Sequence, residues 1–307
     1  MTAKPRRDPW AAWLGERRHG GDPELLRRHL EVLAPIRDQV IANAAVGAGK
    51  RVLDLGCGDG LIALAAAETV GPLGHVICSD VSDEVLDLCR ERAVELGLLE
   101  RCSFVKAAAN DLSPIHDQAV DAVTLRSVLI FEPKKEDAFA ECYRVLRPGG
   151  RLSLFEPINR FEHDQSNRFL GMAYDIAPVA DIARKLRQVY EAIQPSSDPM
   201  RDFDERDLLR FAEAAGFDQV HLTLNITVGP AGPQPWQALV DIAGNPRIPT
   251  LGEAMQQALT PEEADRFVAH LRPLVEHGRG QRRIAVSYLW ATRSTPGHGH
   301  GEATAVG

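Results

Sequence analysis

The sequence predicts an α/β protein with a doubly wound, mostly parallel sheet of seven strands. Two observations carry this prediction. Short apolar runs alternate with helical segments through the first half of the chain, which is typical of parallel strands covered on both faces. Later, two longer strand patterns flank a helical insertion, which fits an antiparallel hairpin at the edge of the sheet.

Residues 1–45 read as an N-terminal helical lid. Asp22 is a typical helix N-cap, and Pro23 suits the first helical position. Apolar and half-polar residues then follow at helical spacing, at Leu25, Leu26, His29, Leu30 and Leu33. The sequence therefore predicts a first helix that begins after Asp22.

Two tryptophans, Trp10 and Trp13, precede this helix and are followed by Gly20 and Gly21. An aromatic pair ahead of a glycine hinge would form a lid that closes over bound ligands. Packing of the same rings onto the first helix is the other interpretation. On the first interpretation, we expect both rings to contact substrate.

Residues 46–157 form the predicted core. Strand patterns lie at Arg51–Leu55, His75–Ser79, Ser103–Lys106, Asp121–Leu125 and Arg151–Phe155, with helical patterns near 60–70, 82–97 and 134–146. The rest of the chain divides into a helical cap segment (158–203), a core helix and strand (204–228), a helical insertion over the substrate pocket (229–280), a final core strand (281–293) and a disordered tail (294–307). Asp204 and Gly216 are expected to start and stop the core helix.

The charge balance of 35 Lys and Arg against 43 Asp and Glu gives a net charge of −8. Such a chain has no general attraction for nucleic acid or for an anionic membrane surface. No apolar run is long enough to span a bilayer, and the first residues lack the apolar core of a signal peptide. We therefore expect a cytoplasmic protein with neither nucleic acid nor membrane as a partner.

Five cysteines occur without CxxC spacing, at Cys57, Cys78, Cys89, Cys102 and Cys142. A chain of this size needs no disulfide framework, so they read as buried thiols in a reducing compartment. The sequence predicts no metal site.

The strongest motif is Gly56-Cys57-Gly58-Asp59-Gly60, between a strand and a helix. Glycines there allow a turn tight enough for main chain to lie against a nucleotide-type ligand, although a turn without a ligand has the same pattern. Asp80 ends the next strand, where a carboxylate accepts both ribose hydroxyls. The alternative for Asp80 is an acid at a helix start.

Four segments together resemble the ordered signatures of one family, the Rossmann-like (class I) S-adenosylmethionine-dependent methyltransferases of small-molecule type. They are Asp54-Leu55-Gly56-Cys57-Gly58-Asp59-Gly60, the acid Asp80, Val120-Asp121-Ala122-Val123 and Tyr143-Arg144-Val145-Leu146-Arg147-Pro148-Gly149-Gly150-Arg151-Leu152. A nicotinamide dehydrogenase would show GxGxxG, whereas Leu61 follows Gly60 here. The resemblance covers roughly residues 51–157 and the two closing strands, and it implies a Rossmann-like fold and S-adenosylmethionine as cofactor.

The resemblance also implies cofactor contacts. The backbone of Gly56, Cys57 and Gly58 would lie against the methionine part, with Asp54 near its amino group. Asp80 would bind the ribose, and Val81 would flank the adenine.

After the third strand the family usually carries an acid close to the adenine, and here Ala108 stands at that position. Ala109 remains next to the adenine, while Asn110 or Asp111 would supply the missing polar contact. Both polar residues suit loop caps equally well. Arg126, at the end of the fourth strand, is a further candidate for the cofactor.

Methyl transfer is an in-line displacement that alignment alone can accelerate, but a hydroxyl acceptor benefits from a base. Glu156 and His163 are the candidate bases, with a structural carboxylate and a solvated loop histidine as the alternatives. Arg126, Asn159 and Arg160 lie where ligands sit in open α/β sheets, and they would hold a substrate carboxylate or form ion pairs.

The acceptor is expected to be a small metabolite or natural-product intermediate. The Asn/Asp-Pro-Pro-aromatic element typical of nucleobase and glutamine methylases is absent after the fourth strand, and the helical insertions can roof a compact ligand. The sequence leaves open whether O, N or C is methylated. It also leaves open a methyltransferase acting on a peptide or protein side chain, a S-adenosylmethionine-binding protein that does not methylate, and homodimer formation.

Overall fold

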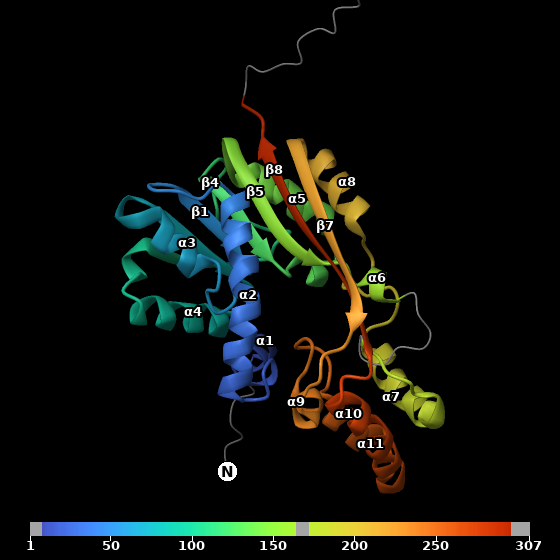
Figure 1. Cartoon of the computed structure of the whole chain (residues 1–307). Helices are drawn as coiled ribbons and strands as arrows, with labels where there is room; N and C mark the ends of the chain where they lie inside the picture. The colour runs from blue at the N-terminus through green and yellow to red at the C-terminus, as the bar shows by residue number, and fades with distance from the viewer. Residues whose placement is uncertain (1–7, 164–171, 296–307) are drawn as a thin grey trace, which may run out of the picture.

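One mixed sheet with helices on both faces forms the body of the protein (Figure 1). The computed structural model describes residues 8–163 and 172–295. The strands run in the order β3-β2-β1-β4-β5-β8, and β7 pairs with the other side of β8. Their bounds are β1 (Arg51–Leu55), β2 (His75–Asp80), β3 (Cys102–Lys106), β4 (Val120–Arg126), β5 (Leu146–Pro157), β7 (Phe217–Pro230) and β8 (Gln281–Arg293).

These seven strands confirm the predicted sheet, and a two-residue strand, β6 (Met172–Ala173), adds a short pairing to the start of β8. Strands β3, β2, β1, β4 and β5 are parallel. Strand β8 is antiparallel to both β5 and β7, so the predicted antiparallel hairpin closes this edge of the sheet. The carboxyl ends of the parallel strands therefore share one edge.

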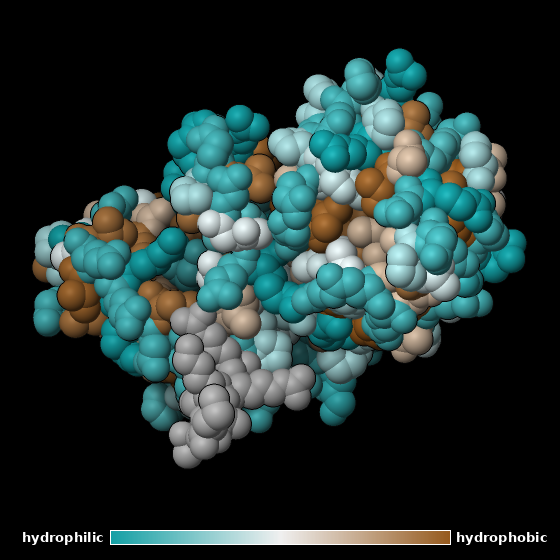
Figure 2. Space-filling model, turned by 90° about the horizontal axis from the view of Figure 1, so that it is seen from below, coloured by the Kyte–Doolittle hydropathy of each residue, from teal (hydrophilic) through white to brown (hydrophobic). Residues whose placement is uncertain are grey.

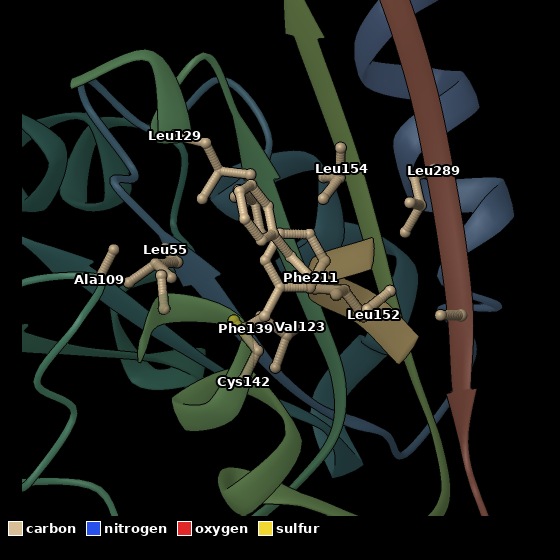
Figure 3. Packing of buried hydrophobic residues seen from close by; sticks show 14 of the residues in the cluster. Leu55, Ala109, Val123, Leu129, Phe139, Cys142, Leu152, Leu154, Phe211 and Leu289 are labelled. Carbon is tan, nitrogen blue, oxygen red and sulfur yellow. The ribbon is translucent and has the colours of Figure 1, made fainter. Parts of the chain in front are cut away.

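Alternate strand residues pack against opposite faces. Leu55, Val123, Leu152 and Leu154 lie on one face, against α5 (Lys135–Val145) and α8 (Glu205–Ala215). Figure 3 shows Phe139 and Cys142 of α5 and Phe211 of α8 meeting these strand residues. Burial on both faces explains why the strands read as continuous apolar runs in the sequence.

The opposite face is covered by α2 (Pro23–Asn43), α3 (Ala63–Val70) and α4 (Asp83–Glu95). Val40 of α2 packs on Phe155. The N-terminal half of α2 continues past the carboxyl edge of the sheet (Figure 1). Asp22 caps α2 as predicted, accepting from the backbone N–H groups of Glu24 and Leu25. Pro35 lies inside this helix without ending it.

The core helix α8 also has its predicted ends. The side chain of Asp204 accepts from the backbone of Arg206 and Asp207, and Gly216 adopts a left-handed φ of 92°. Strand β5 is longer than predicted, since it begins at Leu146 and includes a turn at Gly149, whose φ is 78°. The Pro-Gly-Gly sequence there indicated a loop ahead of the strand rather than a part of it.

The remaining helices form a cap with a core of its own, at the lower right of Figure 1. They are α7 (Ala180–Ile193), α9 (Trp236–Asp241), α10 (Leu251–Ala258) and α11 (Pro261–Glu276), whereas the short α6 (Arg160–His163) lies beside β8, with Phe161 against the main core. Ile182 and Leu186 of α7 pack in one cluster with Phe267 and Leu271 of α11. Two insertions far apart in the sequence thus fold together.

The N-terminal segment lies below the carboxyl edge of the sheet (Figure 1). It contains α1 (Pro9–Ala12) and a π-helical turn at Trp13–Arg17. Single 3-10 turns elsewhere lie at Gly71–Leu73, Leu99–Arg101, Leu129–Phe131 and Ala177–Val179. In the described part of the chain, no helix combines the length and the apolar character that crossing a membrane requires.

Candidate active site

A cavity of about 590 Å³ lies at the edge where the parallel strands end. Residues that directly follow β1, β2, β4 and β5 form its floor, among them Gly56, Val81, Ser127 and Asn159. Most of the other lining side chains are apolar, namely Trp10, Trp13, Leu14, Leu33, Ile130, Phe131, Met200 and Ile242. Its volume is in the range of about 300–1,000 Å³ that is usual for small-molecule sites.

The glycine turn after β1 forms one wall of the cavity. Gly56 and Gly58 have φ values of 64° and 54°, a region that glycine enters without strain. A Cβ atom on Gly56 would lie 2.5 Å from Cγ2 of Val128. The Cys57 N–H donates to the carbonyl of Ser79 at 2.9 Å, which ties the turn to β2. Bare main chain therefore faces the cavity at Gly56 and Gly58.

Asp80 stands at the end of β2, on the cavity wall. Its Oδ2 accepts from the Gly58 N–H at 3.2 Å, and its Oδ1 accepts from the Ser82 N–H at 3.1 Å. Burial raises the pKa of this carboxyl. The carboxylate is thus held in one orientation beside the glycine turn, and Val81 lines the cavity next to it. The expected ribose contact of Asp80 stays a prediction.

Asp54 is buried at the end of β1, beside a smaller hollow that shares Gly56, Gly58, Arg18 and Arg126 with the main cavity. Its Oδ1 accepts from the Thr124 hydroxyl at 2.7 Å. Burial raises the pKa of Asp54 to about 7. A bound cation would favour the ionised carboxylate, as the expected amino-group contact requires. Cys57 lines the same hollow.

Two arginines, Arg18 and Arg126, enter both hollows. Burial lowers the pKa of Arg18 to about 10 and also lowers the pKa of Arg126, and the neighbouring guanidinium adds to the effect on Arg18. Among the described residues, neither has an ion-pair partner within 4 Å; Arg126 Nη1 donates only a 3.4 Å bond to Ser127 Oγ. Two partly buried guanidinium groups without an ion-pair partner form a receptive site for an anion.

The roof of the cavity joins the N-terminal segment to the second helical insertion. Trp13 Nε1 donates to the carbonyl of Ala243 at 2.8 Å, and the Ala243 N–H donates to the carbonyl of Arg17 at 3.0 Å. Arg17 also forms a 2.6 Å ion pair with Glu253 of α10. Seen from below, the surface outside the grey atoms is mostly hydrophilic, with hydrophobic residues in separate patches (Figure 2).

The tryptophan at position 10 packs inside this roof. Its ring meets Phe131 edge to face, with centroids 4.7 Å apart. Phe131 also lies 5.7 Å from the guanidinium of Arg247, which forms a bidentate ion pair with Asp198. Both predicted tryptophans therefore line the cavity, although their contact with a substrate stays a prediction.

Glu156, a candidate base, is completely buried beneath the wall and is absent from the cavity lining. Its Oε1 accepts from the N–H groups of Val128 and Leu129 at 2.8 and 2.9 Å, and its Oε2 accepts from Ile130 at 3.4 Å. Burial raises the pKa of Glu156 to about 7. As placed, the carboxylate holds the turn after β4, and that turn carries Phe131.

The other predicted site residues divide between the cavity and the surface. Ala109 and Asn159 line the cavity. Asn110 and Asp111 do not, and the Asp111 carboxylate accepts from the Ser113 N–H at 3.1 Å, as a loop cap does. Arg160 lies outside the lining and is 3.8 Å from Asp204. His163 ends α6, and its side chain lies outside the described part of the structure.

Sequence reasoning did not single out several lining residues. Arg18 was not among the predicted site residues, and His29 entered only as a position at helical spacing. Glu132 and the stretch Ile242–Gly244 carried no recognised pattern. His29 is a polar residue at a helical spacing otherwise occupied by leucines, and this was the available signal for it.

Comparisons with known proteins agree with this geometry. A family model described as Methyltransferase domain matches residues 53–154. A ubiquinone/menaquinone biosynthesis C-methyltransferase of Pseudomonas putida is 32% identical over 59% of this chain and 70% of its own length. The corresponding protein of Azotobacter vinelandii is 33% identical over the same shares.

Solved structures show the same fold. The YcgJ protein of Bacillus subtilis superposes with a TM-score of 0.51 at 17% identity, covering 84% of this chain and 98% of that one. A phosphoethanolamine N-methyltransferase of Haemonchus contortus, solved with S-adenosylmethionine, gives 0.51 at 16% identity, covering 93% and 56%.

The donor set of the cavity fits that cofactor group by group. The glycines at 56 and 58 have no side chains, so a flat ligand can lie against the main chain there. The Asp80 carboxylate can accept hydrogen bonds from hydroxyls, and the two arginines can bind an anion. S-adenosylmethionine carries ribose hydroxyls, an ammonium group and a carboxylate. The chain therefore belongs to the class I S-adenosylmethionine-dependent methyltransferases, and it is an enzyme that uses S-adenosylmethionine as its cofactor.

Proposed function

We propose that this methyltransferase acts on a compact, mostly apolar ring compound that carries a hydroxyl group, as a hydroquinone does. The observation that carries the proposal is the composition of the cavity beyond the cofactor end. There the lining consists of the rings of Trp10 and Phe131 with Leu33, Met200 and Ile242. Aromatic and aliphatic walls with few polar groups favour a flat apolar ligand.

The division of the cavity follows from the sheet order. The glycine turn and Asp80 follow β1 and β2, on the β3 side of the sheet. Arg126 and Asn159 follow β4 and β5, on the other side. The cofactor would occupy the first part and the acceptor the second, so that the two meet above Gly56 and Arg126.

Residues of this chain would hold the cofactor as follows. Asp80 would accept the ribose hydroxyls, Asp54 would face the ammonium group, and Arg18 with Arg126 would bind the carboxylate. Val81 and Ala109 would lie beside the adenine. Bound there, the cofactor supplies an electrophilic methyl group to the acceptor.

The relatives support a ring carbon as the methylated atom. The Pseudomonas putida protein is named as a C-methyltransferase of ubiquinone and menaquinone biosynthesis, and 70% of its length aligns with this chain. Methylation at a ring carbon is easier when a hydroxyl on the same ring loses its proton, because the negative charge spreads into the ring. A hydroquinone therefore suits both the named reaction and the cavity.

The test uses three aromatic probes with S-adenosylmethionine: 1,4-dihydroxynaphthalene kept reduced, catechol and aniline. The expected result is a methylated product from a hydroxyl-bearing ring, with the methyl position read by NMR. The Asp80→Asn variant serves as the control for background transfer. Methylation of aniline alone, or no product from any ring while S-adenosylhomocysteine binds, would refute the proposed acceptor class.

The contacts across the roof argue against a peptide or protein acceptor. A peptide needs an open groove, whereas here Trp13, Arg17, Ala243 and Glu253 connect the N-terminal segment to the cap. Given that the chain is an enzyme, a binding protein without methylation is no longer the alternative.

We further propose that the protein works in the cytoplasm without nucleic acid. The net charge of −8 and the free thiols of all five cysteines support this. Cell fractionation and a nucleic-acid retention assay would test the two statements. Sedimentation at several concentrations would decide whether a homodimer forms.

A further inference from the structure

Methylation of a hydroxyl-bearing acceptor releases a proton, and the cavity offers few groups to take it. Among the described lining residues, the side chains that accept protons at neutral pH are His29, Asp80 and Glu132. Asp80 accepts two backbone N–H groups, and Glu132 Oε1 accepts from the Lys134 N–H at 2.8 Å. Both carboxylates keep further lone pairs, although backbone N–H groups already orient each of them. The strongest candidate base is a group whose lone pair lies on an atom with no partner in the fold.

His29 has such a lone pair. Its Nε2 is buried without a hydrogen-bond partner, and within the described residues no bond to its Nδ1 is found either. A buried ring nitrogen with no partner is uncommon, because polar atoms inside proteins are usually paired. The arrangement is that of a group whose partner arrives with the ligand.

His29 lies on the side of the cavity where the acceptor would bind. The residue lies in the N-terminal half of α2, which continues past the edge of the sheet below β5 (Figure 1). It shares the cavity with Leu33, one helical turn further along, and with Asn159 and Arg126 after β5 and β4. It thus faces the region where cofactor and acceptor would meet.

The charges around His29 keep it unprotonated. Burial, together with the smaller effects of Arg18, Arg126 and His19 and against the opposite effect of Asp59, lowers its pKa to about 4. An anion bound between the two arginines would cancel part of this field and bring the pKa back toward the usual value of about 6.5. The cofactor carboxylate is such an anion, so the imidazole becomes a better base once the cofactor is in place.

We propose that His29 is the catalytic base that accepts the acceptor's proton, an inference that rests on the proposed function above. In this reaction the acceptor forms a bond to the methyl carbon while the carbon–sulfur bond breaks and leaves its electron pair on sulfur. The hydroxyl proton of the acceptor passes to a ring nitrogen of His29, which later returns it to solvent. When a ring carbon takes the methyl group, that carbon then loses its hydrogen as a proton and the ring oxygen regains one, so that the aromatic ring is restored. No further oxidant, metal or co-reactant takes part.

The first test reads the imidazole directly. Histidine Cε1–H signals of the full chain are titrated by NMR, with and without S-adenosylhomocysteine, and His29→Gln assigns the signal. The expected result is a pKa of about 4 in the free protein that rises when the product analogue binds. A His29 pKa that does not move on binding would overturn the coupling between the arginines and the base.

The second test measures turnover of the hydroxyl-bearing ring probe that the wild-type enzyme methylates. His29→Gln and His29→Asn should lower kcat by about 10²–10⁴-fold, the usual contribution of a positioned base. Binding of S-adenosylhomocysteine and the melting temperature should stay unchanged, and added imidazole should restore part of the rate to His29→Ala. The matched control is His116→Gln, an exposed loop histidine outside the cavity lining.

The outcomes separate the two proposals. A wild-type enzyme that binds the analogue but methylates none of the ring probes contradicts the proposed acceptor class. A wild-type enzyme that methylates a ring while both folded His29 variants keep full kcat contradicts the role of His29. A wild-type rate that levels off above the pKa of His29 in the complex, while the variant rate keeps rising with pH, supports it.

Discussion

Protonation of Asp54 should control how tightly the cofactor binds near neutral pH. The buried carboxyl has a pKa of about 7, raised by burial and only partly offset by its bond from the Thr124 hydroxyl. If it faces the ammonium group of the ligand, only the ionised form gives the favourable contact. Between pH 6 and pH 8 the ionised fraction rises from about one tenth to about nine tenths. The dissociation constant should therefore fall roughly tenfold, or about 1.4 kcal/mol, over this range.

Isothermal titration with S-adenosylhomocysteine at several pH values measures this dependence of affinity on pH. Adenosine lacks the ammonium group and is the control ligand, whose affinity should not show this dependence. Asp54→Asn should bind the analogue more weakly and without the slope. Glu156, whose pKa is also about 7, lies outside the cavity, so Glu156→Gln should keep the slope. Protonation of His29 on binding would have the opposite sign. An affinity that is flat with pH, or a slope that survives in Asp54→Asn, would refute the reasoning.

Three further predictions concern the walls and roof. Asp80→Asn should weaken cofactor binding by about 1–3 kcal/mol, because a charged acceptor for hydroxyls becomes a neutral amide; titration calorimetry measures this, and unchanged affinity would contradict the ribose contact. Glu156→Gln should lower the free energy of unfolding by about 1–3 kcal/mol, because an amide NH₂ would replace an oxygen that faces backbone N–H groups; a large loss of kcat without loss of stability would instead favour a direct catalytic role. Trp13→Phe removes the bond to Ala243 and should raise the KM of the acceptor with little change in melting temperature; an unchanged KM would contradict a roof that depends on this bond.

The parallel half of the sheet could be predicted closely because its signals are local. Each of the five strands is a short apolar run whose alternate residues are buried on opposite faces, as Val52 and Leu53 are. Helix starts at Asp22 and Asp204 were equally readable, since a cap depends on contacts within four residues. Boundaries failed where glycine allows two conformations, as at Gly149.

The site was only partly predictable, and the reason is the range of its contacts. The glycine turn and Asp80 follow directly from the strand–turn–helix pattern, and both line the cavity. Arg18 and His29 become site residues only because distant elements bring Arg126 beside them. Nothing local in the sequence near Trp13 indicates that its indole N–H will meet the carbonyl of Ala243.

The charges in the cavity link cofactor binding to proton removal from the acceptor. The chain as a whole is acidic, yet the cavity gathers two guanidinium groups; Arg126 lowers the pKa of Arg18, and both lower the pKa of His29. Such a cluster is costly in the empty protein, because like charges are held together out of water. A carboxylate bound between Arg18 and Arg126 relieves that cost, so part of the binding energy of the cofactor arises from strain already present in the fold. The same event raises the basicity of His29, which ties proton removal from the acceptor to the presence of the methyl donor.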